Sequence, residues 1–304
     1  AGGHRRDPFA GERTTTFADL LRRIHEEVPA IKRLRFVTSY PRDFGDDVLE
    51  VMRESLRICR YLHVPAQSGS NAVLARMNRG YTVEEYLEFI ERARGMLHQP
   101  EIGRPLTIAG DLIAGFCGET ETDHEATKGL LRRVGYKNCF IFKYSPRPGT
   151  TAFDRLPDDV PEEDKRRRVN ELLAIQQGIS DGISQSHVGS EVEVFVQGVS
   201  AREAKRQRVG GLTTGIKENG VTLTIEGRSA DGTPCQEGAC DPPTATMERR
   251  DHAGIVQLTA RTEGDLIVVF DCPEGRSPDE LIGEMIGVKI ESATALTMFG
   301  RACL

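Results

Sequence analysis

Several features are missing from this 304-residue sequence, and each absence excludes a class of protein. No apolar run approaches the roughly 20 residues that a membrane-spanning helix needs, so no membrane role is expected. No secretory signal pattern is recognised in the first residues, which we interpret as a loop rich in Gly and Arg. The formal net charge of -6 is mild. The chain as a whole therefore lacks the basic excess that is typical of a general nucleic-acid binder.

Metal-binding and disulfide frameworks are also absent from the cysteine pattern. The seven cysteines form neither a CxxC pair nor a CxxxCxxC run. The nearest two, Cys235 and Cys240, flank a glycine-containing loop with no His or Cys partner at ligand spacing, so we expect no metal site there. An odd number of cysteines without framework spacing favours free thiols in a reducing cytoplasm.

Strand and helix patterns alternate along the first part of the chain. Amphipathic helices are predicted at 17–28, 46–57, 83–97 and 121–134, and a long helix from Pro161 onward; strands are predicted at 33–39, 61–66, 107–114 and 138–144. This alternation predicts parallel β/α units. Four strands are too few for a closed eight-stranded barrel, so they form either part of a barrel or an open sheet.

Beyond Ser186 the pattern changes to period two. Short strands are predicted at 191–196, 221–225, 265–270, 287–290 and 295–301, which indicates a small all-β unit. Residues 227–251 are rich in Gly, Pro and charged side chains, and we interpret them as a mobile insertion. The sequence thus predicts a domain boundary near residue 187.

Polar and glycine-bent segments follow each of the four predicted strands. These are residues 38–43, 67–70, 115–120 and 144–150. Such segments are either ordinary turns or, where the carboxyl ends of parallel strands meet, a ligand site. Gly115 and Gly118 would let backbone approach something closely, and Thr120 with Asp123 predicts a capping box, as Thr82 with Glu85 does.

Two ionisable residues lie inside predicted strands. Asp111 is the only acid in an apolar strand, so it is either paired or directed into the barrel, because an unpaired buried charge is costly. His63 is favoured as a hydrogen-bonded core histidine over a ligand. No Ser/His/Asp or Cys/His arrangement and no carboxylate pair can be argued from spacing.

Six motifs in order resemble those of the radical S-adenosylmethionine (SAM) methylthiotransferases. They lie at 38–44, 63–70, 77–82, 111–120, 144–150 and 158–163. The resemblance covers about 17–198 and resumes near 254. Within the family, Gln67-Ser68-Gly69-Ser70 and Tyr144 to Thr150 look like the MiaB type, which converts N6-isopentenyladenosine at tRNA position 37 to its 2-methylthio form.

The resemblance implies a fold and a division of the chain. Residues 1–187 would be the C-terminal portion of a partial (β/α) barrel of the radical SAM type, in the α/β class. Residues 188–304 would form a small all-β barrel like the TRAM module, with an insertion at about 200–253. That module contacts tRNA in the family, which makes the anticodon stem-loop the expected partner, together with an electron-donor protein. A monomer in the cytoplasm is expected.

The resemblance also implies site residues and cofactors. The SAM pocket would include Ser39, Gln67, Ser68, Asp111, Ile113 and Gly115, with Ile113 and Gly115 supporting the adenine. The tRNA would meet Tyr144 and Arg147 at the target base or its phosphates. The β module would add Arg261, Lys289 and Arg301, after a basic run of Arg202, Lys205, Arg206 and Arg208 that a solvated surface explains equally well.

One departure from the family concerns iron. Its members carry two 4Fe-4S clusters held by cysteines of an N-terminal domain and by CxxxCxxC after the first barrel strand, and this sequence has neither ligand set. We therefore expect the chain to correspond to the C-terminal part of such a protein and to be inactive alone. Two alternatives stay open: a methylthiotransferase for threonylcarbamoyladenosine in tRNA, and a tRNA-binding module without chemistry.

Overall fold

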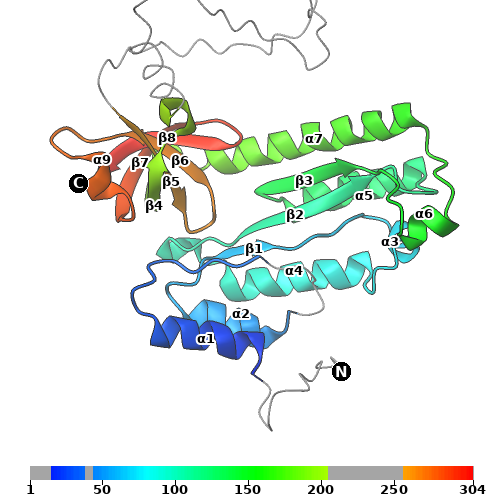
Figure 1. Ribbon diagram of the computed structural model, residues 1–304, viewed down its shortest axis with the longest axis horizontal. Coiled ribbons are helices and arrows are strands. Elements are labelled where there is room, and N and C mark those ends of the chain that lie inside the picture. The colour runs from blue at the N-terminus through cyan, green and yellow to red at the C-terminus, as the bar shows by residue number, and fades with distance from the viewer. Residues whose placement is uncertain (1–14, 38–43, 205–255, 304) are drawn as a thin grey trace, which may run out of the picture.

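The structure, a computed structural model, describes residues 15–37, 44–204 and 256–303. It contains a three-stranded parallel sheet with helices along the chain, followed by a closed β-barrel (Figure 1). Within the described residues, none of the helices combines the length and the apolar character that crossing a membrane requires.

The sheet is parallel in the order β1-β2-β3, as the alternation of strands and helices predicts. The strands are β1 (Tyr61–His63), β2 (Thr107–Ala114) and β3 (Asn138–Lys143). The helical elements are α1 (Phe17–Glu27), α2 (Asp46–Glu54), α3 (Asn71–Arg76), α4 (Val83–Leu97), the short 3₁₀ turn η2 (Pro100–Ile102), α5 (Glu121–Val134), α6 (Thr151–Arg155) and α7 (Glu162–Gln185).

Helix starts follow the sequence closely because side chains cap them. The capping boxes predicted at Thr82 and Thr120 are both present, and Thr16 forms a third one with Asp19 at the start of α1. Gly135, in the left-handed conformation, ends α5. The short helices α3 and α6 are not predicted from the sequence, since five or six residues are too few to show a helical period.

The strand predicted at 33–39 is wrong for the residues that the structure describes. Leu34 forms only an isolated parallel bridge with Ile58, and residues 38–43, including Ser39, lie outside the described part of the chain. On either side of Leu34, the guanidinium groups of Arg33 and Arg35 donate hydrogen bonds to the β-barrel. This segment is therefore held by side chains that reach the barrel rather than by a ladder of backbone bonds.

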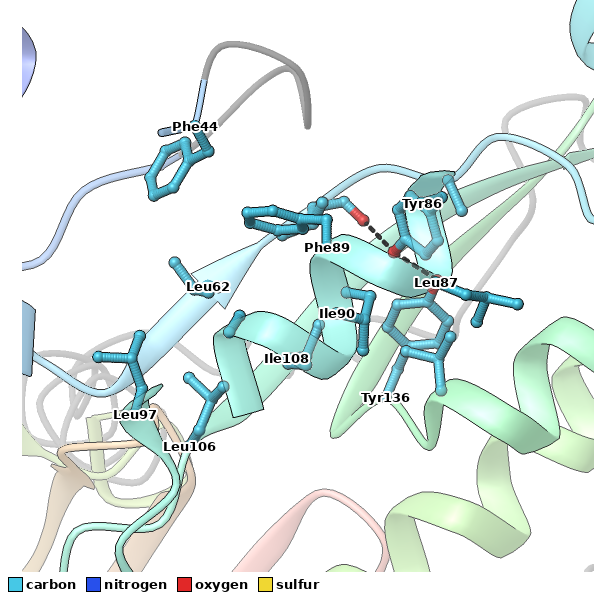
Figure 2. Packing of buried hydrophobic residues seen from close by; sticks show 14 of the residues in the cluster. Phe44, Leu62, Tyr86, Leu87, Phe89, Ile90, Leu97, Leu106, Ile108 and Tyr136 are labelled. Carbon is cyan, nitrogen blue, oxygen red and sulfur yellow. Dashed lines mark hydrogen bonds between the residues drawn. The ribbon is translucent and has the colours of Figure 1, made fainter. Parts of the chain in front are cut away.

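The core lies between one face of the sheet and the helices (Figure 2). Ile108 and Leu112 of β2 point into it, and α4 contributes Tyr86 and Ile90, all nearly fully buried. The Tyr86 hydroxyl donates to the Val64 carbonyl at 2.8 Å and shares a 2.7 Å hydrogen bond with Tyr136. Each large apolar side chain buried here contributes about 1.5–3 kcal/mol, and the paired phenols avoid the cost of unsatisfied hydroxyls.

The barrel is built from five strands, with a closed order β4-β5-β6-β8-β7. These are β4 (Glu191–Val199), β5 (Gln257–Thr262), β6 (Ile267–Asp271), β7 (Met285–Ala293) and β8 (Thr297–Cys303), with the short α9 (Pro278–Leu281). The predicted strands at 191–196, 265–270, 287–290 and 295–301 are found with shifted ends, while 221–225 lies outside the described residues. β5 is not predicted, although its alternating burial matches its sequence.

The barrel contacts the amino ends of the parallel strands through the tip of the β5–β6 hairpin. Thr107, the first residue of β2, donates its hydroxyl to the Gly264 carbonyl at 2.7 Å. Glu263 accepts from Arg104, and Asp265 accepts from Lys137 at 2.6 Å. The barrel therefore lies at one end of the sheet and leaves the carboxyl ends of the strands, near α3 and α6, uncovered by it (Figure 1).

Candidate functional site

Three of the four predicted strand-end segments lie together at the carboxyl edge of the sheet. Gln67 bridges to β2: its N–H donates to the Asp111 carbonyl at 2.8 Å, and its carbonyl accepts from the Ile113 N–H at 2.9 Å. Gly115 directly follows β2, and the Tyr144 N–H donates to the Ala114 carbonyl at 2.9 Å. The fourth segment contains Ser39 and lies outside the described residues.

The sheet face opposite the core carries a polar pair beside exposed aromatic rings. His63 Nε2 lies 3.1 Å from Asp111 Oδ1, and the His63 ring stacks on Phe140 with a centroid distance of 5.8 Å. Phe140 and its neighbour Phe142 are about half exposed, at 47% and 54%. Asp111 is thus paired, as its position in an apolar strand requires. This face offers a carboxylate next to apolar surface, which suits a ligand with both a hydroxylated and an aromatic part.

Gln67 has an unusual backbone conformation for a residue with a side chain. Its φ is +67°, in the left-handed region, and the residue is buried. Such conformations cost free energy and are found often at binding sites. The sequence gives no signal for it, because the conformation is imposed by the bridge to β2 and the turn that follows.

Ser68 faces away from the open sheet face. Its hydroxyl is buried, lies 3.4 Å from that of Thr127 in α5, and accepts the Ser70 N–H. Gly69 packs so closely on α5 that an added Cβ would lie 2.5 Å from the Ala126 carbonyl oxygen. The predicted role of Ser68 in a pocket would therefore be indirect, through the shape of this loop.

Gly115 is surrounded by three charged residues: Glu119 from its own strand-end segment, and Lys165 and Arg168 from α7. Its N–H donates to Glu119 Oε1 at 2.9 Å, and the same oxygen accepts from Arg168 at 2.9 Å. Burial raises the pKa of Glu119 despite these bonds. The close approach expected of Gly115 is to Lys165, whose Cγ would lie 2.4 Å from an added Cβ. In the sequence, Lys165 and Arg168 stand out only as members of a run of mixed charges at the start of α7.

Tyr144 lies at the same edge and stays protonated. Its ring meets Phe116 edge-on at 4.8 Å, and Lys165 Nζ lies 5.5 Å from the ring centroid. Burial, helped by the neighbouring Cys117, raises the pKa of Tyr144 to about 12. Arg147 is exposed in the loop that follows β3. Tyr144 therefore lies beside Gly115 at the end of β3, and Arg147 follows in the exposed loop; their contact with a target base stays a prediction.

The basic residues predicted in the β unit do not form one surface. Lys289 and Arg301 are exposed register partners on β7 and β8, and Arg301 pairs with Glu291 at 3.3 Å. Arg261 lies instead at the junction with the α/β unit, where it pairs with Asp265. Arg202 is exposed, and Lys205, Arg206 and Arg208 lie outside the described residues.

The residues that the structure describes do not assemble a cysteine site for a metal cluster. Cys59, Cys117 and Cys139 are buried at separate places, and Cys272 and Cys303 belong to the barrel. The one group of potential ligands found in the described part is Glu121, His124 and Glu171. Lys128, Arg167 and Arg168 already neutralise its two carboxylates. The hydrogen bond from Lys128 and others lower the pKa of Glu171 to about 2, which indicates an ion-pair network.

Known proteins similar to this chain agree on one family. The model of the radical SAM superfamily matches residues 8–131. Proteins named tRNA-2-methylthio-N(6)-dimethylallyladenosine synthase are 38% identical in Rhodopirellula baltica, over 94% of this chain and 48% of that protein, and 43% identical in Parabacteroides distasonis, over 94% and 49%. The protein of the same name in Phocaeicola vulgatus is 40% identical over 77% of this chain and 48% of its own length.

The chain spans about half the length of the curated relatives it matches. Among solved structures, the radical SAM enzyme coproporphyrinogen III oxidase (HemN) from Escherichia coli matches 56% of this chain and 46% of its own, with a TM-score of 0.38 and 16% identity. Sequence similarity, rather than that structural likeness, is what identifies the family.

Proposed function

Because this chain belongs to the radical SAM methylthiotransferases, we propose that it supplies the SAM-orienting and tRNA-facing parts of an enzyme that methylthiolates N6-isopentenyladenosine at tRNA position 37. The observation that carries the proposal is the gathering of Gln67, Asp111, Gly115 and Tyr144 at the carboxyl edge of the sheet. In β/α barrels this is the edge where ligands bind. The division into a radical SAM unit up to about residue 187 and a TRAM-like unit at 188–304 is part of the same proposal.

The open face of the sheet has the chemistry that an adenosyl ligand needs. Ile113, with Phe140 and Phe142 on the neighbouring strand, offers apolar surface for an adenine ring. Asp111, oriented by His63, offers carboxylate oxygens to ribose hydroxyls. SAM, when bound, supplies the radical-generating chemistry of the superfamily. The residues of this chain orient it, and the apolar rings exclude water from one side.

Tyr144 and Arg147 would receive the target nucleotide. A phenol whose pKa is raised to about 12 can donate a hydrogen bond at physiological pH, and an exposed guanidinium suits a phosphate or a base face. Lys289 and Arg301, side by side on the barrel, would add phosphate contacts. The TRAM identity of the barrel is proposed on this basis and on its place after the radical SAM unit.

The described cysteines do not fit an iron–sulfur cluster, so no step of a reaction is assigned to one on these residues. Two 4Fe-4S clusters, an electron-donor protein, a monomeric state and a cytoplasmic location are proposed for the whole enzyme by resemblance. The same lack of gathered cysteines favours one alternative, a tRNA-binding module without chemistry.

A chimera tests the proposal. The part of the Parabacteroides distasonis relative that this chain does not match is joined to the chain and expressed in bacteria that lack their own methylthiotransferase. Nucleoside mass spectrometry of their tRNA should show 2-methylthio-N6-isopentenyladenosine. Asp111→Asn in the chimera should reduce it at least tenfold, whereas Asp154→Asn, an exposed carboxylate in α6, should not.

Each other outcome of the chimera experiment has a defined meaning. Methylthiolated threonylcarbamoyladenosine in place of the expected product would move the chain to that branch of the family. Binding of tRNA by a soluble chimera that yields no methylthiolated nucleoside would favour the module without chemistry. Equal activity of the Asp111→Asn and Asp154→Asn chimeras would remove Asp111 from the site.

A further inference from the structure

A pocket of about 380 Å³ lies between the segment that precedes α2 and strands β4 and β5 of the barrel. Four of its lining residues are cationic, namely Lys32, Arg33, Arg35 and Arg261, and none is acidic. Phe195 and Gln197 of β4 complete the wall on the barrel side. The pocket is at the opposite end of the sheet from Gly115 and Tyr144 and is not part of the site described above.

The positive charge around this pocket is only partly neutralised. Asp265 is shared by three cations: Arg35 at 2.6 Å, Lys137 at 2.6 Å and Arg261 at 2.9 Å. Lys32 pairs with Glu284 in an exposed ion pair, which is weak in water. Lys137 is not part of the pocket wall, but Arg35 and Arg261 of the wall still share this one carboxylate. The wall therefore keeps a positive excess in a chain whose net charge is -6.

Arg33 is a cation held without a carboxylate among the described residues. Its guanidinium donates to the backbone carbonyls of Arg261 at 2.7 Å and Glu193 at 3.2 Å. Burial lowers the pKa of Arg33 more than the nearby charges of Glu193 and Glu263 raise it, because neither carboxylate forms an ion pair with the guanidinium. The Nε of Arg35 is also buried with no hydrogen-bond partner, which adds a second desolvation cost in this wall.

An oxyanion in the pocket would relieve both costs. Planar guanidinium groups donate in pairs to the oxygens of a phosphate, and such charge-assisted bonds are stronger where water is excluded. The cavity is at the small end of the range for small-molecule sites. Phe195 lies beside these cations, and its aromatic ring can stack on the base of a nucleotide whose phosphate the cations bind.

We propose that this interdomain pocket binds the phosphate group of a nucleotide, with Arg33, Arg35 and Arg261 facing the phosphate and Phe195 facing the base. The nucleotide is either free or part of an RNA chain, since the phosphate chemistry is the same. Binding of a free nucleotide here is independent of the proposed function, whereas binding of the anticodon stem-loop here rests on it.

Isothermal titration calorimetry of AMP and of adenosine with the 304-residue chain tests the proposal. A fluorescein-labelled anticodon stem-loop RNA, followed by fluorescence anisotropy, tests the RNA source. Arg33→Gln removes the charge and keeps a polar side chain at this position. Arg276→Gln is the matched control, because Arg276 is an exposed cation that pairs only with the exposed Glu280 within the described chain.

We expect Arg33→Gln to weaken AMP binding at least tenfold and Arg276→Gln to change it less than twofold. If the nucleotide is part of an RNA, only stem-loop binding shows this difference between the two variants. The salt dependence of stem-loop binding by the Arg33→Gln variant should then be lower by about one phosphate contact. Lys32→Gln, which changes an exposed residue, should weaken AMP binding severalfold. This variant replaces Arg33→Gln in the test if Arg33→Gln does not fold. The proposal is overturned if neither AMP nor RNA binds, if adenosine binds as well as AMP, or if the pocket variants and the control behave alike.

Discussion

Gly115 illustrates how one residue combines backbone and packing requirements. Its φ of +77° disfavours any side chain, and the space where a Cβ would point is filled by Lys165. The sequence indicates that a glycine is needed for a close approach at this turn. The neighbour that approaches is a side chain of α7, fifty residues further along the chain, and only the structure identifies it.

Replacing Gly115 with alanine should destabilise the protein by about 1–3 kcal/mol, because the backbone is strained and Lys165 must move. Thermal unfolding followed by circular dichroism measures the change. Gly129→Ala in α5 is the control: nothing lies within 4 Å of its added Cβ, so alanine should stabilise the helix by up to about 1 kcal/mol. Equal effects of the two variants would contradict this account of Gly115.

Glu119 and Arg168 form a buried ion pair whose side chains are only 2% and 6% exposed. Glu119→Ala leaves the Gly115 N–H without its acceptor and leaves Arg168 with only the exposed Glu121 as a carboxylate partner. We therefore expect a loss of about 3–5 kcal/mol in urea unfolding. Glu125→Ala removes a carboxylate that is 55% exposed and pairs with Lys128. That control should cost less than about 1 kcal/mol. A loss below about 1 kcal/mol for Glu119→Ala would mean that the Glu119–Arg168 pair contributes little to the stability of the fold.

At the scale of elements, the β5–β6 hairpin contacts the amino end of the sheet and helps to fix the barrel there. Its tip residues Glu263, Gly264 and Asp265 all contact the α/β unit, and an added Cβ at Gly264 would lie 2.6 Å from Thr107 Cγ2. Burial opposes ionisation of Asp265, but the hydrogen bond from Lys137 and the surrounding cations outweigh it and lower the pKa of Asp265. The carboxylate is therefore charged at neutral pH.

Asp265→Asn should destabilise the protein by about 1.5–3 kcal/mol at pH 7, the range for hydrogen bonds to charged groups. Because the folded pKa is lowered, the stabilisation is present above the unfolded value of about 3.9 and is lost as pH falls through the folded pKa. The difference between wild type and variant should be constant from about pH 7 to 5 and shrink below about pH 4. Unfolding by denaturant at each pH measures it.

Asp181→Asn, an exposed carboxylate in α7, is the control for the hairpin variant. It should change the unfolding free energy by less than about 0.5 kcal/mol at every pH. A difference between wild type and Asp265→Asn that grows as pH falls would show that the carboxylate is destabilising in the folded protein, contrary to the contacts of the tip.

At the scale of the whole molecule, the two ends of the sheet have different roles. The amino end is covered by the barrel and carries the cationic pocket, and the carboxyl end carries Gln67, Gly115 and Tyr144. The exposed rings of Phe140 and Phe142 lie on the face that joins the two ends. A ligand at one end would therefore not touch residues at the other.

Anaerobic reconstitution with iron and sulfide should leave the purified 304-residue chain colourless, with far less than one cluster per chain by iron analysis. Clusters need several thiolates in one place, and the described cysteines are dispersed. The chimera with the Parabacteroides distasonis relative, treated in the same way, is the positive control and should turn brown. A brown, iron-rich 304-residue chain would show that its own cysteines assemble a site.

The strength of sequence prediction varies with how local the cause of each feature is. Helices α4 and α5 and strand β2 match their predicted ranges because caps and apolar periods lie within the segments themselves. The sequence predicts a strand at 33–39, but the described residues form only one isolated bridge. Arg33 and Arg35 donate hydrogen bonds to barrel residues more than 150 positions away. Distant partners of this kind leave no local pattern.

The sequence by itself determined the alternation of strands and helices, the change to a small β unit after Ser186, and the family through ordered motifs. Tertiary structure alone decided that Ser68 is turned into α5, that Arg261 is separated from Lys289 and Arg301, and that four cations meet in one pocket. The physical reason is that hydrophobic period and capping act over a few residues. Burial and charge balance, in contrast, depend on which distant segments the folded chain brings into contact.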